Sequence, residues 1–484
     1  MKRKKIFFPP KGESAQHAYH SILEKKIKEI NYPFKEFINH QILGSSLLIL
    51  ATIIAVTWAS LPEFSASYLN FVKGTFGIHV FEIDYIKPIT FWVNDIFLTV
   101  FFFFIGLEVK KEFIGGETAN YKKVFLIGFS AVGGVLLPLA IFTILNLDSN
   151  MLQAWGIVIP TDTAFALGIL CLFKKVLPKQ AFVFLALLAV FDDLIAIIVI
   201  ALFYSNSVNL LWLLPAMGTL IVLLFLNYIG YRKFSLYLIL GVLLWVFVEQ
   251  ANIHGSIAGI LMACLIPSRP EVGPNFFIST MKKVIKKFEI RKEQIPKIIE
   301  DPSQFEILMT AKKAVDKTTT PVQKWSRNLD LPVTLVVLPI FALVNSGVNL
   351  KQDLSTNVIS STLFISIIVA LSIGKPVGIT LFGFLALKLK WGVMLNKMNL
   401  RLIFFIGIFA GIGFTMSLFI TSLSFTQQLN NLAIAKTAIL TSTSLSIFAG
   451  LLFFMIDNFC RKTIKTFENN KLKKHTVTTE LQNN

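Results

Sequence analysis

Long apolar stretches recur along almost the whole chain, and they restrict its fold more than any other feature. Each approaches or exceeds the roughly 20 residues that an α-helix needs to cross a bilayer. We count twelve, over approximately 43–61, 89–108, 124–145, 154–173, 181–204, 208–229, 235–250, 253–267, 331–348, 358–388, 401–425 and 432–456. Because backbone groups in hydrocarbon must be hydrogen-bonded internally, these stretches predict an all-α polytopic membrane protein with about twelve transmembrane helices.

The composition agrees with this class of protein. Of the 484 residues, 54% are hydrophobic and only 15% are charged, whereas soluble domains have about 25% charged residues. An ordinary soluble enzyme, a disordered chain and a disulfide-stabilised secreted scaffold are therefore excluded. The three cysteines, Cys171, Cys264 and Cys460, do not have metal-ligand spacing. No apolar segment with a cleavage site follows the basic N-terminus, so we expect no cleaved signal peptide.

The positions of the 46 Lys and Arg residues predict the orientation. If the N-terminus is cytoplasmic and the loops alternate, only Lys73, Lys87 and Lys351 are external, and only Lys375 and Lys436 lie within spans. Basic residues concentrate in cytoplasmic loops, so both termini are predicted to be cytoplasmic. We therefore relate the net charge of +18 to topology and expect no nucleic-acid partner.

This topology divides the chain into three parts. They are a basic cytoplasmic segment (1–42), a twelve-span domain (43–456) with a basic cytoplasmic loop (268–325), and a polar tail (457–484). Residues 15–30 and 275–288 each have one apolar helical face and nearby lysines. Both segments are interpreted either as amphipathic helices on the anionic inner leaflet or as loop helices packed on the bundle. In the external stretch 71–88, apolar and polar residues alternate around Gly77, which predicts a short β-hairpin.

Four charged residues fall in the middle of predicted spans. They are Asp162 in span 4, Asp192 and Asp193 in span 5, and Lys375 in span 10. A structural ion pair would account for one aspartate with Lys375, but at least one carboxylate would remain. Because an unpaired carboxylate at this depth is costly, it is expected to bind a proton or a cation or to face water. We favour a pathway for ions or protons over a purely structural role.

The adjacent aspartates suggest how such a pathway would work. Consecutive helix residues point about 100° apart, so one of Asp192 and Asp193 can pair with Lys375 while the other faces a cavity. Two neighbouring carboxylates titrate as a coupled pair, and carboxylate oxygens are good ligands for hard cations. A site that holds either protons or a cation is the basis of an exchanger.

Two spans carry helix-breaking residues close to these charges. Span 4 contains Pro160 followed by Thr161, and span 11 contains Gly411 and Gly413 followed by Thr415. Spans 3–5 and spans 10–12 would enter the membrane from opposite sides, as inverted-topology repeats require. We expect Asp162 to neutralise the partial positive charges at the N-terminal ends of the broken helices, and Lys375 to neutralise the partial negative charges at their C-terminal ends.

The sequence resembles the NhaA-type sodium/proton antiporters of bacterial inner membranes over nearly all of residues 40–456. The matching segments are FFFFIGLEVKKE (101–112), PTDTAFALGIL (160–170), VFDDLIAIIVIALFY (190–204), IHGSIAGI (253–260), LPIFALVNSGV (338–348), IGKPVGITLF (373–382) and GIGFTMSLFITSLSF (411–425). The paired aspartates, GKPxGI and GIGFTMS are highly specific in combination. The resemblance implies electrogenic exchange driven by the proton gradient and an external hairpin that joins two protomers.

The resemblance also implies roles for individual residues. Asp192 and Asp193 would exchange sodium for protons, with Asp193 as the main cation ligand and Asp192 in a pH-dependent salt bridge with Lys375. Thr161 and Asp162 would lie at the crossing of spans 4 and 11. The transported ions would be Na+, together with Li+, and H+, without a resident cofactor.

Other matching positions lie outside this cluster. Asn94 and Asp95 match polar family positions, while Glu108, Lys111, Glu112 and His254 match positions that would contribute to the response to pH. The family's Glu/His cluster before span 9 is replaced here by Ser326, Arg327 and Asp330. The family's pH range of activation is therefore not carried over to this sequence, while the exchange chemistry is.

Two alternatives remain beside this antiporter with alternating access. A sodium-coupled symporter of a small organic solute would keep the fold but need a larger polar cavity. A membrane receptor or scaffold acting through 268–325 would function without Asp192 and Asp193. An enzyme is disfavoured, because no span carries a nucleophile–base pair, a metal-ligand cluster or a phosphate-binding loop.

Overall fold

The computed structural model describes the backbone of residues 32–482 except 81–82, 116–120, 148–150, 205–208, 292–301, 350–355 and 427. Within these ranges, nine apolar helices are long enough to cross a membrane, and one further pair is bent by 48° between Ala410 and Phe414. Two shorter apolar helices, α10 (Phe234–Gln250) and α11 (Ser256–Leu265), complete the set. These segments coincide with the twelve predicted spans, so the all-α membrane fold is confirmed.

The remaining spans are built from one, two or three helical pieces. Single helices are α2 (Tyr32–Ser60), α6 (Tyr121–Leu145), α8 (Lys179–Phe203), α9 (Leu210–Ile229) and α22 (Leu429–Gln482). Composite spans are α4 (Ile89–Phe91) with α5 (Leu98–Gly115), α7 (Thr163–Leu170) preceded by a 3₁₀ helix (Leu152–Val158), α14 (Pro321–Pro332) with α15 (Leu338–Asn345), α18 (Thr362–Val369) with α19 (Lys375–Lys388), and α20 (Leu400–Ala410) with α21 (Phe414–Ser424).

Span 10 continues through Pro376, since Thr362–Lys388 forms one span. A π-helical stretch, Ala370–Gly374, ends just before α19, and Pro376 occupies the first turn of that helix. Proline is tolerated there, because the missing N–H would have no partner within the new helical segment. The interruptions predicted in spans 4 and 11 are present.

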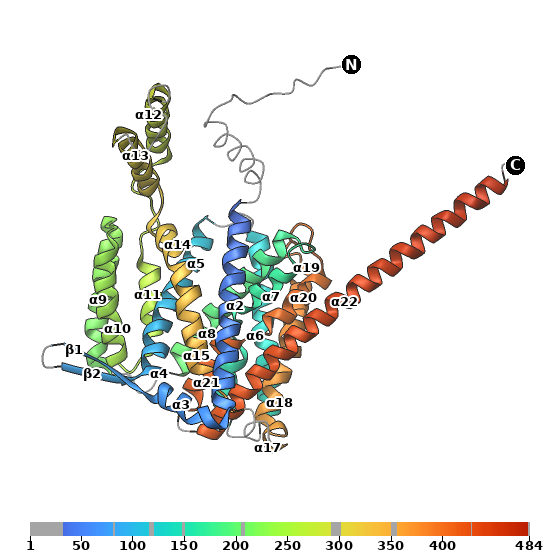
Figure 1. Cartoon of the computed structure of the whole chain (residues 1–484), viewed down its shortest axis with the longest axis horizontal. Coiled ribbons are helices and arrows are strands. Elements are labelled where there is room, and N and C mark those ends of the chain that lie inside the picture. Colours follow the sequence, from blue (N-terminus) through green and yellow to red (C-terminus); the bar gives the residue numbers. More distant parts are fainter. Residues whose placement is uncertain are drawn as a thin grey trace.

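The spans form one bundle, with extensions at both ends (Figure 1). At one end, α3 (Pro62–Lys73) leads into the antiparallel strands β1 (Thr75–Val80) and β2 (Ile83–Pro88), which pair from Thr75–Pro88 to Val80–Ile83. The hairpin predicted within 71–88 is therefore confirmed. At the other end, α2 begins, α22 extends beyond the bundle, and the helices α12 and α13 project (Figure 1). We call this second end the α12 end.

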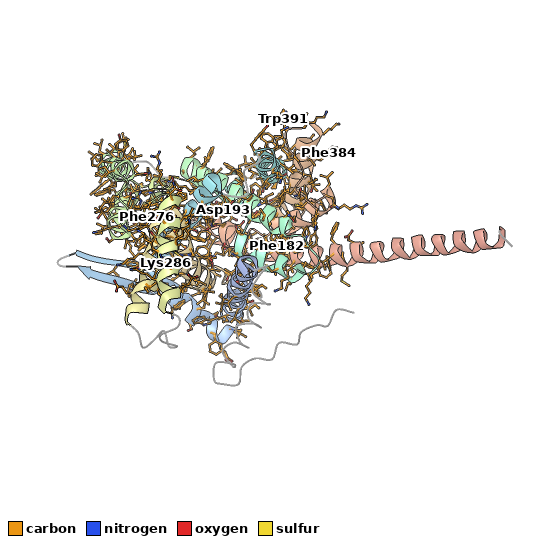
Figure 2. All side chains as sticks on the ribbon, turned by 90° about the horizontal axis from the view of Figure 1, so that it is seen from above. Phe182, Asp193, Phe276, Lys286, Phe384 and Trp391 are labelled. Carbon is orange, nitrogen blue, oxygen red and sulfur yellow. The ribbon has the colours of Figure 1, made fainter. Side chains whose placement is uncertain are left out.

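The basic loop contains a helical hairpin. Helices α12 (Pro274–Arg291) and α13 (Pro302–Thr318) bury Val284, Ile307 and Ala314, and α12 packs chiefly on α13. Phe276 and Lys286 mark α12 in Figure 2. The helix predicted over 275–288 is thus present, and its main packing partner is a second loop helix. Its location on the anionic inner leaflet stays a prediction. Residues 15–30 lie outside the described residues.

Glycines allow α6 and α19 to approach closely, and these two helices have the most extensive contact in the bundle. A Cβ atom added at Gly378 would collide with the backbone carbonyl of Gly133. We expect Gly378→Ala to lower the free energy of unfolding by about 1–3 kcal/mol, the usual cost of overpacking. The matched control is Gly218→Ala in α9, where an added Cβ meets nothing within 4 Å. Thermal unfolding of both purified variants is the measurement, and equal midpoints would contradict the expectation.

Candidate functional site

The two interrupted spans cross each other and satisfy each other's broken backbone. After the 3₁₀ helix Leu152–Val158 the chain is not helical until α7 begins at Thr163, and Asp162 has an extended backbone. The Asp162 N–H donates to the Ile412 carbonyl at 2.7 Å, in the break between α20 and α21. The Thr161 hydroxyl lies 2.9 Å from the Ala410 carbonyl. Irregular backbone is tolerable at this depth because protein groups replace the missing helical hydrogen bonds.

The Asp162 side chain binds the N-terminal ends of both half-helices. Its Oδ1 accepts from the Phe165 N–H at 3.0 Å and so caps α7. Its Oδ2 accepts from the Thr415 N–H at 3.0 Å and the Thr415 hydroxyl at 2.7 Å, in the first turn of α21. A carboxylate here faces the positive ends of two helix dipoles. This geometry accounts for an acidic residue that is only 3% exposed.

Lys375 connects the C-terminal end of the 3₁₀ helix in span 4 to Asp192. Its Nζ atom donates to the Ile159 carbonyl at 2.6 Å, directly after the 3₁₀ helix, and lies 3.1 Å from Asp192 Oδ2. Both side chains are fully buried. The Thr161 hydroxyl lies 2.6 Å from the same Oδ2, so its single hydrogen is shared between Asp192 and Ala410. The positive charge of Lys375 therefore offsets the negative charge of Asp192 and the partial negative charge at the C-terminus of the 3₁₀ helix.

Asp193 has fewer partners than the other buried charges. It is 2% exposed, and its Oδ1 has no hydrogen-bond partner within the described part of the chain. Oδ1 of Asp192 is also unsatisfied there. Asp193 lines a cavity of about 670 Å³ together with Thr161, Asp162 and Thr415, and Figure 2 labels it among the central helices. A buried carboxylate oxygen without a partner is costly, so such a group is best explained as a site for a proton or a cation.

The same cavity extends to polar residues of α5 and α14 at the α12 end. Glu108 accepts a short hydrogen bond from the Ser326 hydroxyl and pairs with Lys111 at 2.6 Å. Arg327 and Asp330 also line the cavity. Glu112 lines a neighbouring pocket that shares Lys111. The structure thus brings Glu108 and Lys111 to the cavity of Asp193, and places Glu112 just beside it.

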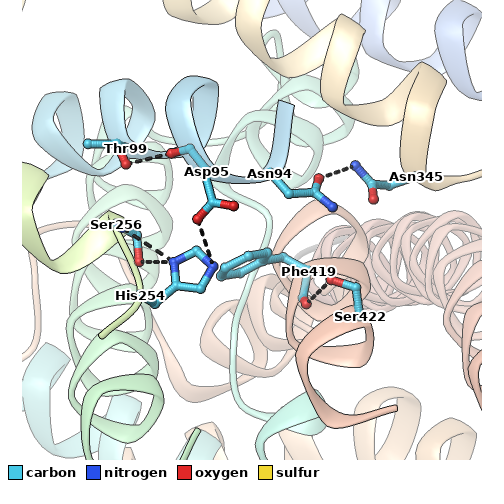
Figure 3. Close-up of polar contacts among 8 residues, drawn as sticks. All are labelled: Asn94, Asp95, Thr99, His254, Ser256, Asn345, Phe419 and Ser422. Atoms are coloured by element: carbon cyan, nitrogen blue, oxygen red, sulfur yellow. Dashed lines mark hydrogen bonds and ion pairs between the residues drawn. The ribbon is translucent and has the colours of Figure 1, made fainter. Parts of the chain in front are cut away.

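His254 lies in a different part of the bundle, next to Asp95 (Figure 3). Its Nε2 is 3.5 Å from Asp95 Oδ1, and its Nδ1 accepts from the Ser256 N–H at 3.3 Å. In the neutral ring the hydrogen is therefore on Nε2, facing the carboxylate. The ring packs edge-on against the ring of Phe419 in α21, with the two ring centroids 4.9 Å apart. Asp95 and Glu108 lie thirteen residues apart on one span, so about 20 Å separates the two clusters.

Several partners of these residues were not predictable from sequence. Thr415, Ser326 and the Ile159 carbonyl carry no signal of hydropathy or spacing that connects them to Asp162, Glu108 and Lys375. Asn345 also donates to Asn94 Oδ1 at 2.8 Å, beside the His254 cluster (Figure 3). The only available signal was the coincidence of polar residues with predicted breaks and span ends.

Three acids and one base buried where two interrupted spans cross define an ion-coupled membrane transporter, not an enzyme. The sequence profile of the family described as Na+/H+ antiporter 1 matches residues 35–454. The chain belongs to this family of sodium/proton antiporters and is a multi-pass bacterial membrane protein.

Relatives from several bacteria agree with this assignment. The chain is 37% identical to the Na+/H+ antiporter NhaA 1 of Pseudoalteromonas atlantica over 93% of its own length and 95% of the relative's. It is 34% identical to the Na+/H+ antiporter NhaA of Christiangramia forsetii, over 89% and 95% of the two chains. It is 32% identical to the Na+/H+ antiporter NhaA of Sulfurimonas denitrificans, over 91% of its own length and 98% of the relative's.

Proposed function

We propose that this protein is an electrogenic antiporter that exports Na+, and also Li+, in exchange for H+ by alternating access, for sodium tolerance and control of internal pH. The observation that carries the proposal is Asp193, a buried carboxylate with an unsatisfied oxygen at the inner end of a cavity. Asp193 is the main cation ligand. Protons and sodium compete for it, and an empty charged site does not cross the membrane readily.

Asp192 couples the exchange to Lys375. When Na+ reaches Asp193, the Asp192 carboxylate also coordinates the cation, and its contact with Lys375 weakens. If two protons leave the site for each sodium ion that enters, one from Asp193 and one from the Asp192–Lys375 pair, one net charge crosses per cycle, which makes the exchange electrogenic. Thr161 and Asp162 support the site by holding the crossing of the interrupted helices.

The polar clusters at the two ends of span 2 serve the response to pH in this proposal. Glu108, Lys111 and Glu112 lie at or beside the cavity at the α12 end, and His254 contacts Asp95 at the other.

The proposed setting is the bacterial inner membrane, with both termini cytoplasmic. Helix α2 begins and α22 ends at the α12 end, where the basic loop also projects (Figure 1). That agreement supports a cytoplasmic α12 end next to an anionic leaflet. The β1–β2 hairpin, which extends beyond the bundle, supports a homodimer joined through this element.

Competition between the ions tests the proposed function. In reconstituted vesicles, Na+ and Li+ are expected to drive proton movement and K+ to have little effect. Because protons and sodium share the site, lowering the pH by one unit should raise the sodium concentration for half-maximal exchange about tenfold when one proton competes, and more when two do. Half-maximal sodium concentrations measured from pH 6 to 9 give the slope. A value independent of pH would contradict a shared site, and sodium-driven solute uptake without proton movement would favour a symporter.

A further inference from the structure

A second cavity, of about 390 Å³, lies at the α12 end and shares no residue with the cavity of Asp193. It forms where three span ends meet. The segment before α8, the beginning of α20 and the end of the apolar part of α22 each contribute to it. Since spans begin and end at the surface of the hydrocarbon layer, this cavity lies at the depth of the lipid headgroups.

The walls of the cavity have two chemically distinct parts. Lys397 and Arg401 provide exposed positive charge, and within the described part of the chain neither side chain forms an ion pair or a side-chain hydrogen bond. Phe405, one helical turn after Arg401, continues the wall into the apolar layer with Phe453 and Phe454. The ring of Phe405 lies 5.8 Å from that of Phe453 and 6.1 Å from that of Phe454. A pair of cations thus borders an aromatic surface.

We propose that this cavity binds an anionic phospholipid. Its phosphate lies between Lys397 and Arg401, and its acyl chains follow Phe405, Phe453 and Phe454. Arginine recognises phosphate through two parallel hydrogen bonds, while lysine contributes a point charge. Asp457 also lines the cavity, and a carboxylate in the wall favours a headgroup with one phosphate over one with several phosphates. Phosphatidylglycerol has this chemistry.

Such a lipid would stabilise the interrupted span on which the exchange site depends. Phe173, the last residue of span 4, packs on Phe405 of α20 and on Phe454 of α22, with ring centroids 5.5 Å and 4.5 Å apart. The lipid would cover this contact from the membrane side. It would thereby hold α20 against two neighbours without touching Asp193.

Lipid binding to the purified full-length protein tests the site independently of transport. After delipidation, phosphatidylglycerol is expected to raise the thermal midpoint and to remain bound in native mass spectrometry. Removing both charges, with Lys397→Gln and Arg401→Gln, should weaken this binding by about 30-fold, since each basic residue near an anionic headgroup strengthens binding by about fivefold. Phosphatidylcholine and inorganic phosphate are the comparison ligands.

A matched double variant controls for the loss of two charges. Lys388→Gln with Lys390→Gln removes two exposed basic residues outside the cavity, and Lys390 shares the left-handed backbone of Lys397 (φ 60° and 59°). This control should bind lipid as the wild type does. Val176→Trp, at a residue 61% exposed in the cavity wall, should exclude lipid without a change of charge and serves if the charge variant does not fold. Equal binding by all variants, equal effects of phosphatidylcholine, or full stabilisation by inorganic phosphate alone would each overturn the proposal.

Discussion

Asp193→Asn is expected to abolish sodium-driven proton movement, with a loss of at least about 100-fold. An amide has nearly the same shape as the carboxyl group, but it neither binds and releases a proton at working pH nor offers a charged ligand to sodium. The loss of a charge-assisted contact in a buried site is worth about 3 kcal/mol or more, which corresponds to this factor. The measurement is the change in internal pH when sodium is added to vesicles that contain the purified variant.

The same substitution on the surface is the control for this experiment. Asp316→Asn changes a half-exposed acid of α13 that pairs with Lys324 at 3.1 Å, and it should leave exchange intact. Because Asp193→Asn removes a charge that burial disfavours, its thermal midpoint should equal or exceed that of the wild type. Normal exchange by Asp193→Asn would mean that the cation binds elsewhere.

The fold was predictable to the extent that length and hydropathy determine it. Twelve spans and two interruptions follow from apolar runs and from residues such as Pro160 and Gly413. The π-helical stretch before Lys375 was not predictable, because it depends on how the helix accommodates Pro376 against its neighbours. The pairing of α12 with α13 was missed for a related reason. An amphipathic pattern shows that a helix has an apolar face, but not what covers that face.

The candidate site was predictable in its residues and less so in its contacts. The cost of burying charge singles out Asp162, Asp192, Asp193 and Lys375 from sequence alone. Hydrophobic periodicity does not decide which aspartate faces the lysine, because residues 100° apart on a helix are equivalent until their neighbours are known. The bond from Thr415 to Asp162 joins residues 253 positions apart. Such contacts depend on the arrangement of spans 4 and 11 in space.

Lys375→Met should destabilise the protein even in the absence of sodium. Methionine has a similar length and no charge, so it leaves Asp192 and the Ile159 carbonyl without their partner in a fully buried position. Removing one member of a buried ion pair costs about 3–5 kcal/mol, because the remaining charge is left uncompensated. The thermal midpoint of the purified protein in detergent is the measurement, and it is expected to fall by several degrees.

A second substitution identifies which carboxylate the lysine compensates. Asp192→Asn combined with Lys375→Met removes both charges of the pair, so the double variant should recover most of the stability that Lys375→Met loses, as expected when two residues are directly coupled. Asp193→Asn combined with Lys375→Met should recover less, because the lysine lies 3.1 Å from Asp192 and Asp192 would remain charged. Equal recovery by the two double variants would show that the lysine serves both aspartates alike. No recovery in either would show that the lysine stabilises the fold mainly through the helix C-terminus at Ile159.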